Sequence, residues 1–304
     1  MATSRKPDRL AIAIVAGCCL SWGFQQVAAK VALAEVSGLT QAAIRSTGAA
    51  IFIGALMAWR DPRSLRIGPE VWQGLLSAGL FSIEFMLLFV ALEHTTASHA
   101  VLFLYTHPFF VALGLLVFSP GERLRGLQWA GLALSFAGVA VALRVSGVQS
   151  RSMLLGDLAV LGAGACWGLQ TLQFRLTRLR ETPPMRGLLY QLAISSVVLS
   201  LLAWLRGEHW PTHVSPVVMA SLVYQTIWIA GITFWLWIWL VSRYRAGELS
   251  AFTFATPMIG VLAGVFVLGE STPPGFLVAV AMVTAGIALV NWPAKADDVQ
   301  PVEA

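Results

Sequence analysis

Charged residues are scarce in this sequence. Asp, Glu, Lys and Arg together make up 12% of its 304 residues, whereas an ordinary soluble domain carries about 25%. Hydrophobic residues make up 57%, and the mean hydropathy is +0.75. No stretch is long and polar enough to form a soluble domain. The composition therefore excludes a soluble globular protein and predicts one that is embedded in a membrane.

Signals of several common protein classes are also missing. The apolar runs show no strand-like alternation, which argues against an outer-membrane β-barrel. The three cysteines, Cys18, Cys19 and Cys166, lie inside apolar runs without metal-ligand spacing, and a disulfide between the adjacent pair would be strained. A loop of the form GxxxxGK[ST] is absent, which argues against ATP hydrolysis by this chain. We expect neither a metal site nor a cofactor.

What the sequence does contain is ten apolar runs joined by short loops. A helix needs roughly 20 apolar residues to cross about 30 Å of hydrocarbon, so each run predicts one transmembrane helix. The runs are 10–33, 38–60, 71–93, 97–118, 124–144, 154–175, 186–205, 215–242, 248–268 and 274–292. The first run is too long for the apolar part of a secretory signal, so we expect it to be retained.

The basic residues are distributed unevenly among the loops. With a cytoplasmic N-terminus, 15 of the 20 Lys and Arg fall on the cytoplasmic side, four fall outside, and Arg45 lies within a helix. Basic loops are retained in the cytoplasm, so we expect both termini there and the chain in a bacterial inner (plasma) membrane. The basic residues are dispersed and accompany no nucleic-acid-binding motif, so no nucleic-acid partner is expected.

One motif occurs twice. Cys19–Lys30 reads CLSWGFQQVAAK, and Gly164–Arg175, 145 residues later, reads GACWGLQTLQFR. The ends of the two halves also align. The matched pairs there are Pro108 with Pro257, Gly121-Glu122 with Gly269-Glu270, and Ala137-Gly138 with Ala285-Gly286. The sequence therefore predicts an internal repeat.

Each repeat would contain five helices. Because five is odd, the second copy must enter the membrane from the opposite side, as in transporters that hold a solute near the midplane between inverted repeats. The sequence thus predicts an all-α membrane protein with ten transmembrane helices in two inverted five-helix repeats (5+5). The repeats are expected at 10–144 and 154–292, with cytoplasmic segments at 1–9 and 293–304.

The repeated Trp-Gly, the later proline, the Gly-Glu and the closing Ala-Gly resemble the EamA-type members of the drug/metabolite transporter superfamily. The resemblance covers residues 10–292. It implies a secondary transporter, not an enzyme, that exports small metabolites by alternating access. Bacterial ten-helix members include exporters of aromatic amino acids, so amino acids are the expected solutes.

Two alternatives stay open. Efflux of hydrophobic or quaternary cations is one, although the small drug pumps of the superfamily place a glutamate in the first helix and this chain has none there. A membrane-embedded enzyme is the other. The only aspartate in any apolar run, Asp157, lies near a run's end without a partner motif, which argues against an intramembrane protease.

Polar and aromatic side chains inside the runs predict the path of the solute. Trp22 and Gln25 lie on one side of the first predicted helix, and Trp167 and Gln170 take the same places in the sixth. Buried amides need hydrogen-bond partners. We expect these amides to line a solute cavity; the other interpretation is that they hold neighbouring helices together. The residues expected to line the cavity are Trp22, Gln25, Gln26, Glu84, Phe103, His107, Trp167, Gln170, Thr171, Tyr224 and Trp228.

Buried charges and prolines predict an ion pair and a gate. Arg45 and Glu84 fall at similar depths, which indicates either an ion pair or recognition of a zwitterion. Pro108 and Pro257 each remove a helical hydrogen bond, so both are hinge candidates. His107 is deep enough to carry a proton, to donate to the solute or to be an ordinary interior histidine.

The remaining expectations concern partners. Lys30 lies near the outer edge and is expected to extend to the interface. Gly164-xxx-Gly168 and Gly260-xxx-Gly264 allow close helix contact, expected within one chain. The partners are then the lipid bilayer and a small-molecule solute, with a monomer favoured and a dimer possible.

Overall fold

The computed structural model describes residues 7–118, 126–244, 253 and 255–290. Most of the predicted terminal segments 1–9 and 293–304 lies outside these residues, as does Gly121-Glu122. The helices are α1 (Arg9–Ala32), α2 (Gly38–Arg60), α3 (Val71–Ala91), α4 (Ala97–Leu104), α5 (His107–Phe118), α6 (Gly126–Gln149), α7 (Arg151–Leu176), α8 (Pro184–Leu205), α9 (Pro216–Val223), α10 (Phe234–Arg243), α12 (Ala255–Leu268) and α13 (Pro274–Val290), with 3-10 helices η1 (Pro62–Leu65) and η2 (Arg178–Glu181) and a π-helix η3 (Tyr224–Thr233).

The described chain is helical throughout its regular elements, as predicted. Eight helical segments are long and apolar enough to cross a membrane, and α12 and α13 are shorter apolar helices. Each of the ten predicted runs overlaps one of these segments. The chain is therefore an integral membrane protein whose described part is helical, and the inversion of its halves stays a prediction.

Short polar residues begin several helices. The Asp8 carboxylate accepts a hydrogen bond from the Ala11 amide at 2.8 Å, and Ser150 Oγ accepts one from the Met153 amide at 3.0 Å. Near this point the helices extend beyond the predicted apolar runs, since α6 continues to Gln149 and α7 begins at Arg151.

The fourth predicted helix is broken where its proline stands. α4 ends at Leu104 and α5 begins at His107, one residue before Pro108. The Thr106 hydroxyl donates to the Phe103 carbonyl at 2.6 Å, which satisfies an acceptor at the end of α4. The kink expected at Pro108 is confirmed and is a full interruption. Pro257 lies in the first turn of α12, but residues 245–252 and 254 lie outside the described part, so a matching kink stays a prediction.

The eighth predicted helix contains a π-helix that the sequence did not indicate. η3 connects α9 to α10, and its turns are wider than those of an α-helix. Two tryptophans of α10 contact basic residues. The Trp235 ring lies 5.1 Å from the Arg60 guanidinium, and the Trp239 ring lies 4.6 Å from that of Arg243. Tryptophans beside basic residues are typical of the aromatic belt at a membrane interface.

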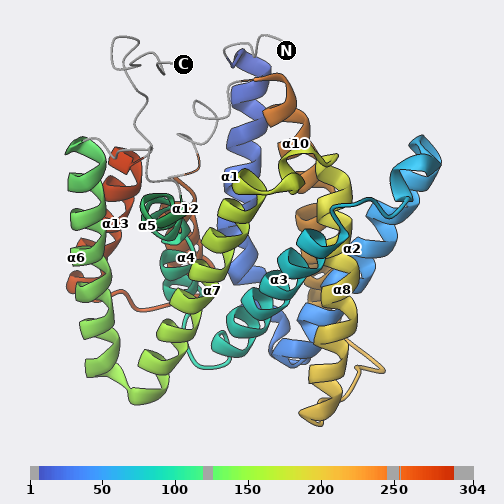
Figure 1. The fold of residues 1–304 in the computed structure, drawn as a ribbon. Coiled ribbons are helices and arrows are strands. Elements are labelled where there is room, and N and C mark those ends of the chain that lie inside the picture. Colours follow the sequence, from blue (N-terminus) through green and yellow to red (C-terminus); the bar gives the residue numbers. More distant parts are fainter. Residues whose placement is uncertain (1–6, 119–125, 245–252, 254, 291–304) are drawn as a thin grey trace.

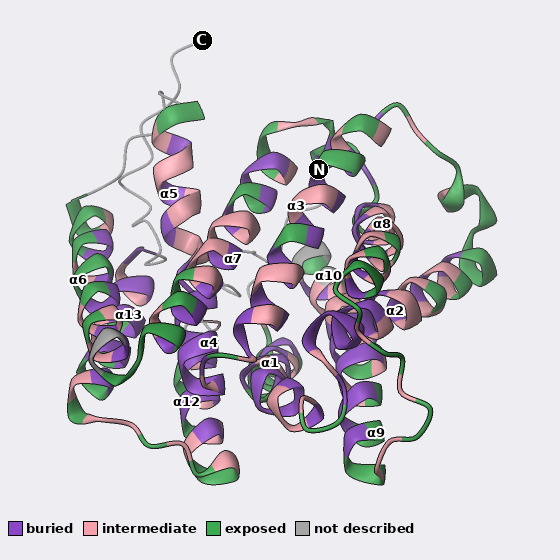
Figure 2. Ribbon diagram, turned by 90° about the horizontal axis from the view of Figure 1, so that it is seen from below, coloured by how far each residue is buried: buried purple, intermediate pink, exposed green. Residues whose placement is uncertain are grey.

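The helices form two outer groups with a central group between them (Figure 1). α6 and α13 pack along each other on one side, and α2, α3 and α8 form the opposite side. In between, α1 packs against α12 and α9, α7 packs against α4 and α5, and α4 also contacts α12. Figure 2 shows buried residues concentrated on the central helices and exposed residues on the outer faces, where lipid is expected.

Candidate solute pathway

The glycine of the repeated Trp-Gly motif has the same packing role in both halves. A Cβ added to Gly23 of α1 would lie 2.7 Å from Ile259 Cγ2 of α12. A Cβ added to Gly168 of α7 would lie 2.6 Å from Phe110 Cβ of α5. Ile259 and Phe110 each stand two residues after the proline of their own half. Each glycine therefore admits the helix that follows a proline.

The first copy of the motif faces η3 and α10. Trp22 Nε1 donates to Thr233 Oγ1 at 2.9 Å, and the Trp22 ring meets the Trp237 ring edge-on at 5.5 Å between centroids. Gln25 and Gln26 are buried, and Gln26 Oε1 has no hydrogen-bond partner among the described residues. The amides of this copy are thus buried without a polar network around them.

The second copy of the motif faces the break between α4 and α5. The Trp167 ring stacks on His107, with centroids 3.7 Å apart and planes 19° apart, and it meets Tyr105 edge-on at 5.5 Å. His107 Nδ1 is buried without a hydrogen-bond partner in the described chain. Two predicted neighbours lie elsewhere, because Phe103 is fully buried in the core and Thr171 is exposed.

A chain of hydrogen bonds continues from this motif through three helices. Gln170 Nε2 of α7 donates to Glu84 Oε2 of α3 at 2.6 Å. Gln191 Nε2 of α8 donates to Gln170 Oε1 and to Ser77 Oγ of α3, both at 2.9 Å. Glu84 and Gln170 are brought together from the predicted set. Gln191 and Ser77 were missed, although each is a polar residue inside a predicted apolar run.

The predicted ion pair between Arg45 and Glu84 is absent from the described structure. The Arg45 guanidinium instead lies over the Phe85 ring, 4.1 Å from its centre, and its Nε and Nη1 are buried without hydrogen-bond partners. The physical reason is helical geometry, since neighbouring residues point about 100° apart. Phe85 faces α2, and Glu84 turns toward α7 and Gln170.

Tyr224 and Trp228 both reach Ser21, the residue before Trp22. Tyr224 Oη donates to the Ser21 carbonyl at 2.7 Å, and Trp228 Nε1 donates to Ser21 Oγ at 2.9 Å. The Trp228 ring is 43% exposed. The structure thus places these two predicted residues at the contact between α1 and η3, separate from the Trp167 group.

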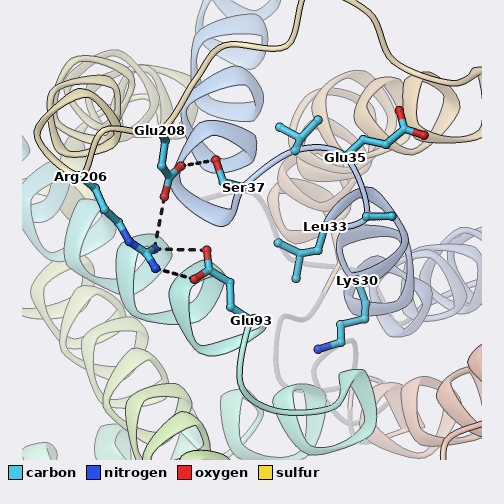
Figure 3. A pocket seen from close by; sticks show the side chains of 9 residues that line it. Lys30, Leu33, Glu35, Ser37, Glu93, Arg206 and Glu208 are labelled. Atoms are coloured by element: carbon cyan, nitrogen blue, oxygen red, sulfur yellow. Dashed lines mark hydrogen bonds and ion pairs between the residues drawn. The ribbon is translucent and has the colours of Figure 1, made fainter.

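A pocket of about 590 Å³ opens beyond the ends of α1, α3 and α8 (Figure 3). Arg206 crosses it and pairs with Glu93 at 2.6 Å and with Glu208 at 3.2 Å. The hydrogen bond to Glu93 raises the pKa of Arg206 above its ordinary value. Glu208 also accepts from Ser37 Oγ at 2.6 Å, so the network connects α8 to the start of α2.

Lys30 lies at the rim of this pocket. Its Nζ donates to the carbonyl oxygens of Leu92 and Thr95 at 2.5 and 2.6 Å, and its extension to the interface stays a prediction. A second pocket of about 560 Å³ lies beside α2, α9 and η3. Neither pocket is lined by a residue predicted for the central cavity, which stays a prediction.

Long apolar helices whose interior contains joined polar side chains are typical of membrane transporters. The model of the EamA-like transporter family matches residues 9–144 and 154–292, so the chain belongs to this family.

Curated relatives cover most of the chain. The "Uncharacterized transporter YvbV" of Bacillus subtilis (strain 168) is 26% identical over 93% of this chain and 92% of its own. A "Probable amino-acid metabolite efflux pump" of Salmonella typhimurium is 27% identical, covering 93% and 94%. The "Aromatic amino acid exporter YddG" of Ancylobacter novellus is 28% identical, covering 71% and 74%. A solved crystal structure, 22% identical, superposes with a TM-score of 0.64 over 93% of this chain and 96% of its own, which supports the fold.

Proposed function

We propose that this transporter exports small metabolites from the cytoplasm, with amino acids, including aromatic ones, as its main solutes. The observation that carries the proposal is one face of α7. There Trp167 presents an aromatic ring beside His107, and Gln170 presents an amide bound to Glu84. Aromatic faces bind flat side chains, and buried polar groups bind a charged backbone. The names of two relatives, an amino-acid metabolite efflux pump and an aromatic amino acid exporter, support the same solute class.

The buried charges suit a zwitterion. Two guanidinium nitrogens of Arg45 have no hydrogen-bond partner among the described residues. In the proposal the solute's carboxylate binds Arg45 and its ammonium group binds near Glu84. Solute entry then supplies the partners that Arg45 lacks, which offsets the cost of burying it.

Alternating access requires two halves that move against each other, which we propose to be inverted repeats. The packing supports this. α1 contacts α12 as α7 contacts α5, and the pairs α2–α8 and α6–α13 each join corresponding helices of the two halves. The break before Pro108 and its counterpart Pro257 are the proposed hinges. The excess of Lys and Arg in one set of loops supports cytoplasmic termini in an inner membrane.

The test is uptake by liposomes that contain the purified protein. We expect flux of at least one aromatic amino acid above that of empty liposomes, and a strong decrease in Trp167→Ala and Gln170→Ala. Trp129→Ala is the matched control, because Trp129 is 49% exposed on α6. Flux of a quaternary cation, without flux of any amino acid, would favour cation efflux and overturn the proposal.

A further inference from the structure

A second buried polar cluster lies where α4 and α7 begin. Asp157 of α7 is fully buried, and His99 of α4 is 2% exposed. His99 Nδ1 lies 2.7 Å from Asp157 Oδ2. Thr95 Oγ1 and Ser146 Oγ of α6 also donate to the Asp157 carboxylate. No partner motif accompanies Asp157 in the sequence, because its partners come from other helices.

The cluster is enclosed by apolar and polar groups of the surrounding helices. The His99 ring is stacked on Phe276 of α13, with centroids 3.9 Å apart and planes 2° apart. Lys30 of α1 reaches the cluster's edge, since it donates to the Thr95 carbonyl at 2.6 Å. Among the described residues, Asp157 is the one carboxylate that pairs with His99.

Other charged groups act at a distance. The Glu270 carboxylate accepts hydrogen bonds from the Ala97 and Ser98 amides at 2.7 and 2.9 Å, and so holds the first turn of α4 from its other side. Glu84 is hydrogen-bonded to Gln170, and His107 stacks on Trp167. Gln170 and Trp167 lie about 15 Å or more along α7 from Asp157. The other titratable or charged residues near this end of the adjoining helices are Glu93, His94, Arg144 and Arg151.

The geometry defines two states that differ by one proton. A carboxylate only accepts hydrogen bonds, so Nδ1 of His99 carries the hydrogen that faces Asp157. With a neutral imidazole, the pair has a net charge of −1. A proton added to Nε2 gives an imidazolium paired with the carboxylate, and the net charge becomes zero. Ionisable groups inside a membrane are costly and mark ion pathways and proton relays.

The cluster is also mechanically connected to the solute pathway. His99 stands near the beginning of α4, and Tyr105, just after its end, contacts Trp167. The distance along the helix is about 9 Å. A change in how strongly Asp157 holds α4 therefore reaches the break in the fourth helix. Glu84 differs from this cluster, because it contacts the predicted solute pathway directly through Gln170.

We propose that the Asp157–His99 pair is a reversible proton-binding site that couples proton movement to solute movement. The coupling rests on the proposed transport function, whereas proton binding does not. One proton is taken from water onto His99 Nε2 and later returned to water, and no covalent bond between heavy atoms changes.

Proton binding is tested by NMR of protein with labelled histidine. The chain has only five histidines, so the signal of His99 is assigned by its loss in His99→Gln. We expect that signal to change with pH across the range in which the protein stays folded, and to be altered in Asp157→Asn. Ser152→Ala is the matched control, because Ser152 contacts the exposed His94. A His99 signal that is constant across this range would overturn the proposal.

Coupling is tested by flux in liposomes. One pH unit corresponds to a factor of about ten in concentration for each coupled proton. We expect wild-type protein and His94→Gln to accumulate the solute about tenfold in such a gradient, and His99→Gln and Asp157→Asn only to equilibrate it. Full accumulation in both variants would disprove coupling at this pair. Absence of flux from every sample, while His99 still titrates, would refute the transport function and leave proton binding supported.

A variant that keeps both members of the pair tests the proposal even if the other variants misfold. Ser146→Ala removes one donor to Asp157 and leaves both Asp157 and His99 in place. We expect it to fold, to alter the His99 titration and to reduce accumulation. Unchanged titration and accumulation in Ser146→Ala would contradict the proposal even if Asp157→Asn cannot be purified.

Discussion

In the first copy of the repeated motif, Trp22 donates a hydrogen bond to Thr233, whereas in the second copy Trp167 stacks on His107. The glutamines differ as well. Gln170 joins Glu84 to Gln191, and no side-chain hydrogen bond of Gln25 occurs among the described residues. The two glycines behave alike, since each admits the helix after a proline. The two copies of the motif thus share a backbone contact and differ in their side-chain chemistry.

The largest difference is expected between the two glutamines. Gln170→Leu would leave the Glu84 carboxylate buried without its hydrogen-bond donor and would leave Ser77 as the one partner of the Gln191 amide. We expect a cost of about 3 kcal/mol or more in the free energy of unfolding. Gln25→Leu breaks no such bond and should cost less than about 1 kcal/mol. Thermal unfolding in detergent measures both. Equal losses would show that Gln25 has partners in the folded protein and that the copies have not diverged here.

The two glycines should give similar losses. Gly23→Ala and Gly168→Ala each force a Cβ within 3 Å of a neighbouring helix, at a cost of about 1–3 kcal/mol. Gly17→Ala in α1 is the matched control, because its Cβ would meet nothing within 4 Å. In α7 the control is Gly162→Ala, whose Cβ makes ordinary contact with Leu87 at 3.4 Å.

The melting temperatures of these four variants test whether the two glycines have the same packing role. Both controls should match or exceed the wild type, since alanine favours helix. A destabilised Gly23→Ala beside an unaffected Gly168→Ala would mean that the shared backbone contact exists in one copy only.

The features that the sequence predicted are those with local causes. The ten apolar runs follow from hydropathy, and the break at Pro108 follows from its missing N–H. The similar depth of Arg45 and Glu84 in the membrane was also predicted from the sequence. Depth along a helix, however, does not determine toward which neighbouring helix a side chain points. Phe85 therefore replaced Glu84 as the contact of Arg45.

Features that depend on distant parts of the chain could not be read in this way. The partners of Asp157 come from α4 and α6, and no spacing within one helix indicates them. The π-helix η3 carries no proline or glycine cluster that would set it apart from an ordinary helix. Its hydrogen bonds to Ser21 show that contact with α1 accompanies the irregular turns.

The loss in the free energy of unfolding should differ less between the two tryptophan variants than between the two glutamine variants. Trp22→Phe removes the indole hydrogen bond to Thr233, which contributes about 1 kcal/mol. Trp167→Phe keeps a ring that can stack on His107, so its loss should be about half as large. Chemical unfolding followed by circular dichroism measures the two. A larger loss in Trp167→Phe would show that the second copy depends on the wider indole ring and not on stacking alone.

The smallest effect is expected one residue before each tryptophan, where Ser21 corresponds to Cys166. Ser21 Oγ accepts a hydrogen bond from Trp228, whose ring is 43% exposed. Sulfur is a weak acceptor, so Ser21→Cys should cost about 0.5 kcal/mol and change the fluorescence of Trp228. Cys166→Ser should change neither stability nor fluorescence, because the described contact of this residue is made by its carbonyl oxygen, which accepts from Gln170 Nε2 at 3.3 Å. A larger response in Cys166→Ser would place a polar partner beside the second copy and remove the distinction between the two, since both copies would then use this position for a side-chain hydrogen bond.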